Sequence, residues 1–306
     1  MKTFAFWFTA LRIPFASVAL VPFAVGFIWA FSEKMEVSWL MFILGEIAVL
    51  LICFSCHLFG EIIDQVEDKK TLVYGRSKFA GGTLMIATGK IPPIHAAIAA
   101  AIFLFISFVC GLIITFYYKN FILFGLGFFG AACAVLYSVP PLRLVRRGLG
   151  ELFIGICYGW LTLVTGYATA SGCLPSSNSI LFCLPVALSV FNIILINEYP
   201  DFQADFEVGK KNLMIRLGKK KASMVYAVAN ILIIFSFLII YINLYQDSLI
   251  YILILIPVSV VALVLSYNIA ILRKYEFPAK LEKCCASTIL LNHICSITLA
   301  VLFICR

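Results

Sequence analysis

Long apolar runs separated by short polar stretches make up most of this 306-residue chain. A transmembrane helix needs about 20 mostly apolar residues, because the hydrocarbon core of a bilayer is about 30 Å thick and a helix rises about 1.5 Å per residue. The pattern predicts an all-α, polytopic membrane protein whose helices surround a central apolar pocket. Nine runs are long enough to span the membrane, and they cover residues 7–31, 38–60, 93–116, 120–138, 149–171, 178–198, 222–245, 248–272 and 285–305.

Basic residues indicate the orientation of these spans, since short cytoplasmic loops are enriched in lysine and arginine. With the N-terminus inside, only Lys34, Lys119 and Arg306 of the 23 basic residues fall on the outer side, and the C-terminus lies outside. The net charge of +8 therefore follows from the topology, and we expect no binding of nucleic acid. Because the longer polar loops also lie inside, we expect the chemistry at the cytoplasmic face.

Acidic residues are rare, and eight of the 15 fall in two short segments, 61–68 and 198–207. The first segment belongs to GEIIDQVED and the second to NEYPDFQADFE, and both contain E-x-x-D-x-x-x-D at a constant offset of 137 residues. Each follows an even-numbered span. We interpret this as an internal pseudo-repeat of about four helices with a ninth helix added, within a single domain that covers residues 1–306.

Each acidic segment predicts a stripe of three carboxylates, because residues three and four apart share one face of a helix. Like charges in such a stripe repel one another unless a cation lies between them. Hard oxygen ligands without neighbouring histidine or cysteine suit Mg²⁺, which is often shared with substrate phosphates. The predicted metal ligands are therefore Glu61, Asp64, Asp68, Glu198, Asp201 and Asp205.

A solvated acidic loop is the alternative interpretation of one such cluster, and the second cluster in register disfavours it. Pro200 lies inside the second stripe, where we expect it to end or kink the sixth span. Glu67 and Glu207 lie off the stripes, so we expect them to face solvent or a lysine.

Two carboxylate clusters at the mouth of an apolar bundle suit a substrate with a diphosphate head and a long hydrocarbon tail. Mg²⁺ would bridge the head to the acids, and the tail would lie between helices. Departure of diphosphate from an allylic carbon leaves a carbocation, so the leaving group needs charge stabilisation while water is excluded.

These residues resemble the motifs of the UbiA superfamily of intramembrane prenyltransferases, and the resemblance covers essentially the whole chain. The family's first motif, N-D-x-x-D-x-x-x-D, reads Gly60, Glu61, Asp64 and Asp68 here. Its second motif is D-x-x-x-D followed by glycine and a basic residue, which reads Asp201, Asp205, Gly209 and Lys210. YSVPPLRLVRRGLGEL at 137–152 and GGT at 81–83 are similar to the branch that prenylates 1,4-dihydroxy-2-naphthoate for menaquinone.

The resemblance implies an enzyme of a prokaryotic cytoplasmic membrane that moves a polyprenyl group from its diphosphate to an aromatic or quinone-precursor acceptor. It implies two Mg²⁺ ions bound with the diphosphate. The catalytic residues would be Asp64, Asp68, Asp201 and Asp205, and the supporting ligands Glu61, Asn197 and Glu198. Basic residues would assist the departure of diphosphate, namely Lys210, Arg143 and Arg76.

Arg12 and Tyr137 are further candidates for substrate binding. Arg12 lies near the start of the first span, where a cation either reaches the interface or contacts the diphosphate or an acceptor carboxylate. Tyr137 borders the loop after the fourth span, and in that loop we expect Arg146 and Arg147 to serve the positive-inside orientation. Glu46, inside the second span, is an intramembrane acid without a predicted partner.

Gly60 and Glu61 depart from the family's motif, which has Asn and Asp there. One interpretation is drift at a tolerant position, and the other is a divergent branch that uses another acceptor or cyclises its substrate. UbiA-like enzymes that cyclise terpenes or prenylate a glycerol phosphate would share every motif described above. A CDP-alcohol phosphotransferase would need D-G-x-x-A-R, which neither segment contains, and a cation transporter would place its acids near the bilayer midplane.

Overall fold

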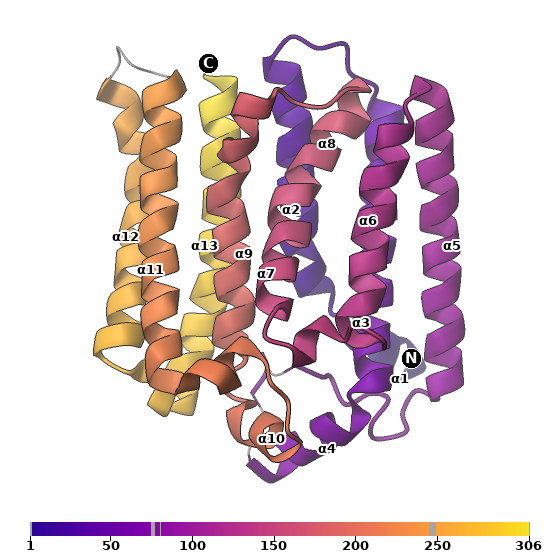
Figure 1. Ribbon diagram of the computed structural model, residues 1–306, viewed down its shortest axis with the longest axis vertical. Helices are drawn as coiled ribbons and strands as arrows, with labels where there is room; N and C mark the ends of the chain where they lie inside the picture. Colours follow the sequence, from indigo (N-terminus) through magenta and orange to yellow (C-terminus); the bar gives the residue numbers. More distant parts are fainter. Residues whose placement is uncertain (1, 75–76, 80, 245–248, 306) are drawn as a thin grey trace.

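Helices run nearly the full height of the molecule, and no strand occurs among the residues that the structure describes (Figure 1). The computed structural model describes residues 2–74, 77–79, 81–244 and 249–305. Within these residues, nine helical segments are long and apolar enough to cross a membrane, which confirms the predicted all-α polytopic fold.

The first four spans are single helices, α2 (Ile13–Ser32), α3 (Trp39–Ile63), α5 (Pro93–Tyr118) and α6 (Phe121–Ser138). The fifth span combines α7 (Gly150–Ile154), the π-helical η2 (Gly155–Leu161) and α8 (Thr162–Ser171), and the sixth combines the 3₁₀-helical η3 (Ser177–Cys183) with α9 (Leu184–Asn197). The seventh span is α11 (Leu213–Leu244) and the ninth is α13 (Pro278–Ile304). Between them, the eighth combines the 3₁₀-helical η4 (Leu249–Leu255), α12 (Ile256–Ser266) and the π-helical η5 (Tyr267–Ile271). Short helices complete the chain: α1 (Lys2–Ala10), α4 (Gln65–Tyr74), η1 (Leu144–Arg146), α10 (Phe202–Glu207) and η6 (Lys274–Glu276).

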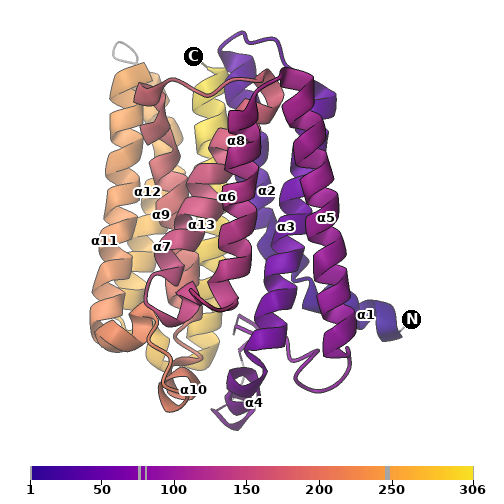
Figure 2. The same cartoon turned by 45° about the vertical axis from the view of Figure 1, so that its right-hand side comes forward.

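The first span begins six residues later than predicted, at Ile13 rather than at residue 7. Arg12 adopts the left-handed conformation, with φ 50° and ψ 48°, which interrupts the helix. Pro14 in the first turn of α2 is compatible with a helix start, because no earlier carbonyl awaits its missing N–H. The separate helix α1 points away from the bundle (Figure 2), and it leaves Phe4 and Phe8 exposed.

Two other spans differ in the opposite direction and begin before the predicted boundary. α11 starts at Leu213 rather than at 222, and α13 starts at Pro278 rather than at 285. Their first turns carry several lysines, so hydropathy does not mark them although the backbone is helical. Gly218 kinks α11, with φ 74° and ψ 155°. The predicted start of the eighth span, residue 248, lies outside the described residues.

Glycines bring α2 and α8 into backbone contact. A methyl group at Gly26 would lie 2.2 Å from the carbonyl oxygen of Leu163, and one at Gly166 would lie 2.0 Å from that of Phe23. Small residues at such crossings let membrane helices approach closely. By contrast, α5 and α6 are mostly exposed and carry large apolar side chains such as Phe105, as expected for helices that face lipid.

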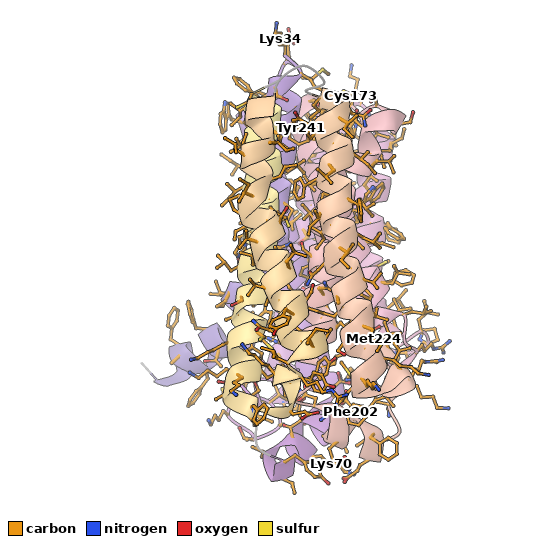
Figure 3. The ribbon with its side chains drawn as sticks, turned by 90° about the vertical axis from the view of Figure 1, so that its left-hand side faces the viewer. Lys34, Lys70, Cys173, Phe202, Met224 and Tyr241 are labelled. Atoms are coloured by element: carbon orange, nitrogen blue, oxygen red, sulfur yellow. The ribbon has the colours of Figure 1, made fainter. Side chains whose placement is uncertain are left out.

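The loops predicted to share a side do lie at the same end of the bundle. Lys34 and Cys173, from two loops predicted to be outside, lie at one end, whereas Lys70 and Phe202, from two loops predicted to be inside, lie at the other (Figure 3). The helices α4 and α10 contact each other at this second end (Figures 1 and 2).

Candidate active site

The two acidic segments continue from the ends of α3 and α9 at the same end of the bundle. Neither segment is one continuous helix, so the predicted stripes are each interrupted. α3 ends at Ile63 and α4 begins at Gln65, with Asp64 between them. α9 ends at Asn197, and Pro200, which disfavours the helical conformation for the residue before it, lies in the turn that leads to α10.

Local geometry nevertheless keeps the predicted pairs of aspartates together. The backbone N–H of Asp68 donates to the carbonyl of Asp64 at 2.8 Å, and that of Asp205 donates to the carbonyl of Asp201 at the same distance. The i, i+4 relation within each segment therefore survives the break in the helix.

Side chains from both segments line one cavity of about 160 Å³, which we call the polar cavity. It collects almost all of the predicted site residues, namely Arg12, Glu61, Asp64, Asp68, Tyr137, Asn197, Glu198, Asp201, Asp205 and Lys210. Arg143 lies beside it, with its Nη2 3.7 Å from Oδ1 of Asp64. Arg76 lies outside the described residues.

Five oxygen atoms of these side chains are buried without a hydrogen-bond partner in the described structure. They are Oε2 of Glu61, Oδ1 of Asp64, Oδ2 of Asp68, Oδ1 of Asn197 and Oε2 of Glu198. Buried carboxylate oxygens are costly unless a cation or donor compensates them, and hard oxygen donors suit Mg²⁺. Among the described residues, no three acidic, histidine or cysteine side chains already converge around one metal position. The donor set therefore fits a metal that takes its remaining ligands from water or a phosphate.

A loop at residues 81–83 closes over the carboxylates. The N–H of Gly81 donates to Oδ2 of Asp201 at 2.7 Å, and the N–H of Thr83 donates to Oε1 of Glu61. A methyl group at Gly82 would lie only 1.8 Å from Oδ2 of Asp68, so glycine is needed for this approach. The guanidinium of Arg12 donates to the carbonyl of Gly81. The loop thus links Arg12 to both acidic segments.

Basic residues and one amide hold the second segment. Nζ of Lys210 lies 3.1 Å from Oδ2 of Asp205, and Nδ2 of Asn212 donates to the same oxygen at 2.9 Å. Gly209, with φ 67°, provides the turn that returns Lys210 to the aspartate. Asn212 was not among the predicted site residues, and its position two residues after Lys210 is the only sequence signal that points to it.

The prediction that Glu67 faces solvent or a lysine is wrong. Its side chain is buried and lines the polar cavity, and its Oε1 lies 3.4 Å from Nη1 of Arg146. Arg146 also donates to the carbonyl of Val208, the residue after the second acidic segment, at 2.8 Å, so it links the first segment to the end of the second in addition to adding positive charge. For Glu207 the prediction is confirmed, because it is exposed and lies 3.8 Å from Nζ of Lys70.

Burial shifts the titration of the acidic side chains outside the spans. Burial, followed by the carboxylates of Glu61 and Asp64, raises the pKa of Asp68 to about 8. Burial also raises the pKa of Asp64 and that of Asp201 to about 6, although neighbouring cations lower both. For Lys210, burial lowers the pKa, but the surrounding carboxylates outweigh burial and hold it well above its ordinary value. The cavity therefore disfavours the ionised form of these carboxyl groups, and a bound cation would favour it.

An apolar cavity of about 580 Å³ adjoins the polar one. Its walls come mainly from α3, α5, α6 and the α7–η2–α8 span, and they include Gly111 and Gly127. Tyr137, Ile154 and Tyr158 line both cavities, so a ligand can lie with a polar end among the acids and an apolar end between helices. Glu46 lines neither cavity, although its Oε2 is buried without a partner in the described structure.

Comparison with known proteins supports the same interpretation. The sequence profile of the UbiA prenyltransferase family matches residues 19–283. This chain belongs to the UbiA prenyltransferase family. The resemblance inferred from the two motifs is thus confirmed, and the family together with the nine apolar helices makes the chain an integral membrane protein.

Relatives of this UbiA family member include two bacterial proteins. The bacteriochlorophyll synthase 33 kDa chain of Cereibacter sphaeroides is 34% identical over 116 residues, which are 36% of this chain and 38% of that protein. The 1,4-dihydroxy-2-naphthoate octaprenyltransferase of Bacillus subtilis is 28% identical over 209 residues, which are 67% of this chain and 64% of that protein. The chain therefore aligns with less than two thirds of the length of either relative.

Solved structures share the fold over nearly the whole chain. A UbiA homologue from Archaeoglobus fulgidus, bound to DMAPP and Mg²⁺, has a TM-score of 0.68 and 15% sequence identity, and the match covers 94% of this chain and 97% of that chain. At this identity the likeness is one of fold.

Proposed function

We propose that this UbiA family member is an enzyme that transfers a polyprenyl group from its diphosphate to an aromatic quinone precursor, with 1,4-dihydroxy-2-naphthoate as the candidate acceptor. The observation that carries the proposal is the set of buried carboxylate and amide oxygens from two distant segments that line one cavity without a hydrogen-bond partner in the described structure. The adjoining apolar cavity and the naphthoate octaprenyltransferase among the relatives support it.

The acidic segments would hold the diphosphate through Mg²⁺, with two ions expected from the pair of motifs. Asp64, Asp68, Asp201 and Asp205 are the proposed catalytic ligands, supported by Glu61, Asn197 and Glu198. When bound, Mg²⁺ would neutralise charge that develops on the leaving diphosphate. Lys210 and Arg143 would bind diphosphate oxygens, and Arg12 would close the cavity from the side of the loop 81–83.

The reaction proposed for this cavity breaks the bond between the allylic carbon and the diphosphate oxygen, which leaves with the electron pair. The ring of the acceptor then supplies two electrons to the allylic carbon and a carbon–carbon bond forms. The attacked ring carbon then loses its proton, or its carboxylate as CO₂ where it carries one, and the bond electrons return to the ring. Tyr137 and Tyr158, on the wall shared by the two cavities, would flank the allylic carbon while the prenyl tail occupies the apolar cavity. Exclusion of water by this wall would protect the carbocation.

The proposed setting is a prokaryotic cytoplasmic membrane, with the N-terminus and the polar cavity on the cytoplasmic side and the C-terminus outside. The distribution of lysine and arginine supports this orientation. The parallel passages from α3 to α4 and from α9 to α10 support a pseudo-repeat within one domain of residues 1–306. Cys305 is the exposed cysteine of the described chain, so a membrane-impermeant maleimide should label it from the outside.

The test is incubation of purified protein with prenyl diphosphates of several lengths, with and without the naphthoate, in Mg²⁺ or in chelator. Mass spectrometry should detect a prenylated naphthoquinol that requires both the acceptor and Mg²⁺. Asp64→Asn and Asp201→Asn should each abolish diphosphate release. Glu207→Gln is the matched control, because this exposed acid belongs to the same segment but lies outside the cavity.

Other products would identify the rival functions. A cyclised hydrocarbon without acceptor would indicate a terpene cyclase, and a prenyl ether of a glycerol phosphate would indicate a lipid prenyltransferase. Diphosphate release that persists in both aspartate variants would refute the proposed mechanism.

A further inference from the structure

An open space lies between α3 and α6 at the inner end of the polar cavity. Gly60 is on α3, one helical turn before Asp64, whose N–H donates to the Gly60 carbonyl at 2.9 Å. A methyl group at Gly60 would meet only Oγ of Ser138, at an ordinary contact distance of 3.7 Å. Gly60 and Ser138 both line the polar cavity. The space in front of Ser138 is therefore open to a ligand in that cavity.

Ser138 differs from other buried serines and threonines of the bundle in its hydrogen bonding. Its side chain is only 1% exposed, and its Oγ has no hydrogen-bond partner among the described residues. By comparison, Oγ of Ser296 donates to the carbonyl of Asn292 at 2.9 Å, and Oγ1 of Thr115 donates to that of Gly111 at 2.7 Å. A buried hydroxyl without a partner is unfavourable, so this one is suited to bind a ligand that supplies a partner.

The charges around the cavity indicate what kind of group would bind there. Carboxylates predominate on the wall, and Glu61 is the next residue after Gly60. An anionic ligand group at Ser138 would be repelled by them, whereas a neutral hydroxyl would not. A serine hydroxyl can donate one hydrogen bond and accept two, so it pairs with another hydroxyl in either direction.

We propose that Gly60 and Ser138 form a niche that binds one ring hydroxyl of the aromatic acceptor and thereby determines acceptor specificity. This inference rests on the proposed function. The motif that the chain resembles has asparagine at the position of Gly60, and an asparagine side chain here would occupy the niche. Glycine at this position thus leaves room for an oxygen of the acceptor where asparagine would place its own side-chain amide.

The experiment compares the wild type with Ser138→Ala and Gly60→Asn. Acceptor affinity is measured by calorimetric titration in the presence of Mg²⁺ and an analogue of prenyl diphosphate. Binding is measured rather than turnover, so that acceptors that react slowly can be compared with those that react fast. The probes are 1,4-dihydroxy-2-naphthoate and the two analogues that lack one hydroxyl each, 1-hydroxy-2-naphthoate and 4-hydroxy-2-naphthoate. Ser296→Ala is the matched control, because it removes a buried helix hydroxyl that its own helix satisfies.

Ser138→Ala should weaken binding of the dihydroxynaphthoate by about 3- to 10-fold, the range expected for one lost hydrogen bond. The analogue that lacks the hydroxyl bound in the niche should bind the wild type and Ser138→Ala equally. Gly60→Asn should weaken acceptor binding more strongly, by at least about 10-fold, because it fills the niche. In both variants the KM for prenyl diphosphate should change less than about twofold, and Ser296→Ala should match the wild type.

Three results would overturn the inference. In the first, Ser138→Ala weakens the binding of all three acceptors equally, or weakens only the binding of prenyl diphosphate. The serine then has a structural role, and the niche does not determine acceptor specificity. If the wild type forms no prenylated naphthoquinol, the proposed function fails and the niche fails with it. An active wild type whose acceptor affinity does not respond to either variant refutes the niche alone.

Discussion

Gly82 offers a direct test of whether the loop at residues 81–83 positions the acidic site. In Gly82→Ala, the new methyl group would lie 1.8 Å from Oδ2 of Asp68, whereas ordinary contact begins at 3.4 Å. The carboxylate must therefore withdraw by about 1.6 Å. A displacement of about 1 Å at a reacting group can cost about 100-fold in rate, so we expect kcat/KM for prenyl diphosphate to fall about 100-fold, or about 2.7 kcal/mol of transition-state stabilisation.

The fold itself should tolerate this change, because the atoms that must move form the carboxylate at the end of a side chain. Forcing Asp68 away from its preferred rotamer costs about 0.5–1.5 kcal/mol, so the melting temperature should fall by only a few degrees. The assay combines steady-state kinetics with a Mg²⁺ titration of the purified variant. Gly125→Ala is the control, because a methyl group there meets nothing within 4 Å. Wild-type kinetics in Gly82→Ala would refute the argument that Asp68 must keep its position.

Three further predictions concern pH, Lys210 and the apolar cavity. The pKa of Asp68 is about 8 in the folded protein, whereas an ordinary aspartate has a pKa near 4. Between these two pH values the folded, metal-free protein binds more protons than the unfolded chain. Its free energy of unfolding should therefore fall as the pH rises through this window. Scanning calorimetry should show this fall and a larger Mg²⁺-induced rise in melting temperature at pH 8.5 than at pH 6, and a metal-free protein that becomes more stable with rising pH would contradict it. Lys210→Met should lower kcat about 100- to 1000-fold, as loss of one charge-stabilising donor does, whereas Lys211→Met, an exposed neighbour, should stay within about twofold of the wild type. Gly127→Leu should shift the preference in a competition assay toward shorter prenyl diphosphates by filling the apolar cavity, and an equal shift in Gly125→Leu, outside that cavity, would show that the cavity is not responsible.

The number and approximate extent of the spans could be predicted from the sequence, because the thickness of the bilayer sets a minimum apolar length. The predicted boundaries of the spans were wrong where the thickness of the bilayer does not limit the helix. The first turns of α11 and α13 extend beyond the apolar runs. At Arg12, a left-handed residue separates two apolar helices that hydropathy joins into one. Backbone conformation of this kind depends on the tertiary contacts of Arg12, which an apolar run does not encode.

The residues of the polar cavity could largely be predicted, because the spacing of acids within each segment and the repeat between segments place them at one end of the bundle. The loop at 81–83 could not be derived in the same way, since its donors are backbone N–H groups that every residue carries. The burial of Glu67 was missed because its partner, Arg146, comes from another loop. Pairings between distant loops depend on the folded arrangement, and local spacing says nothing about them.

The wall of Tyr137, Ile154 and Tyr158 between the two cavities is also a boundary between two dielectric environments. On one side lie ionised groups and space for water, and on the other lies hydrocarbon. Two unit charges 4 Å apart interact by about 1 kcal/mol in bulk water and by about 4 kcal/mol at the effective dielectric constant of 20 found near protein surfaces. Charges next to this wall therefore attract and repel one another more strongly than the same charges in a solvated loop. A polar substitution at Ile154 would admit water across the boundary and weaken every one of these interactions at once, without touching a charged residue.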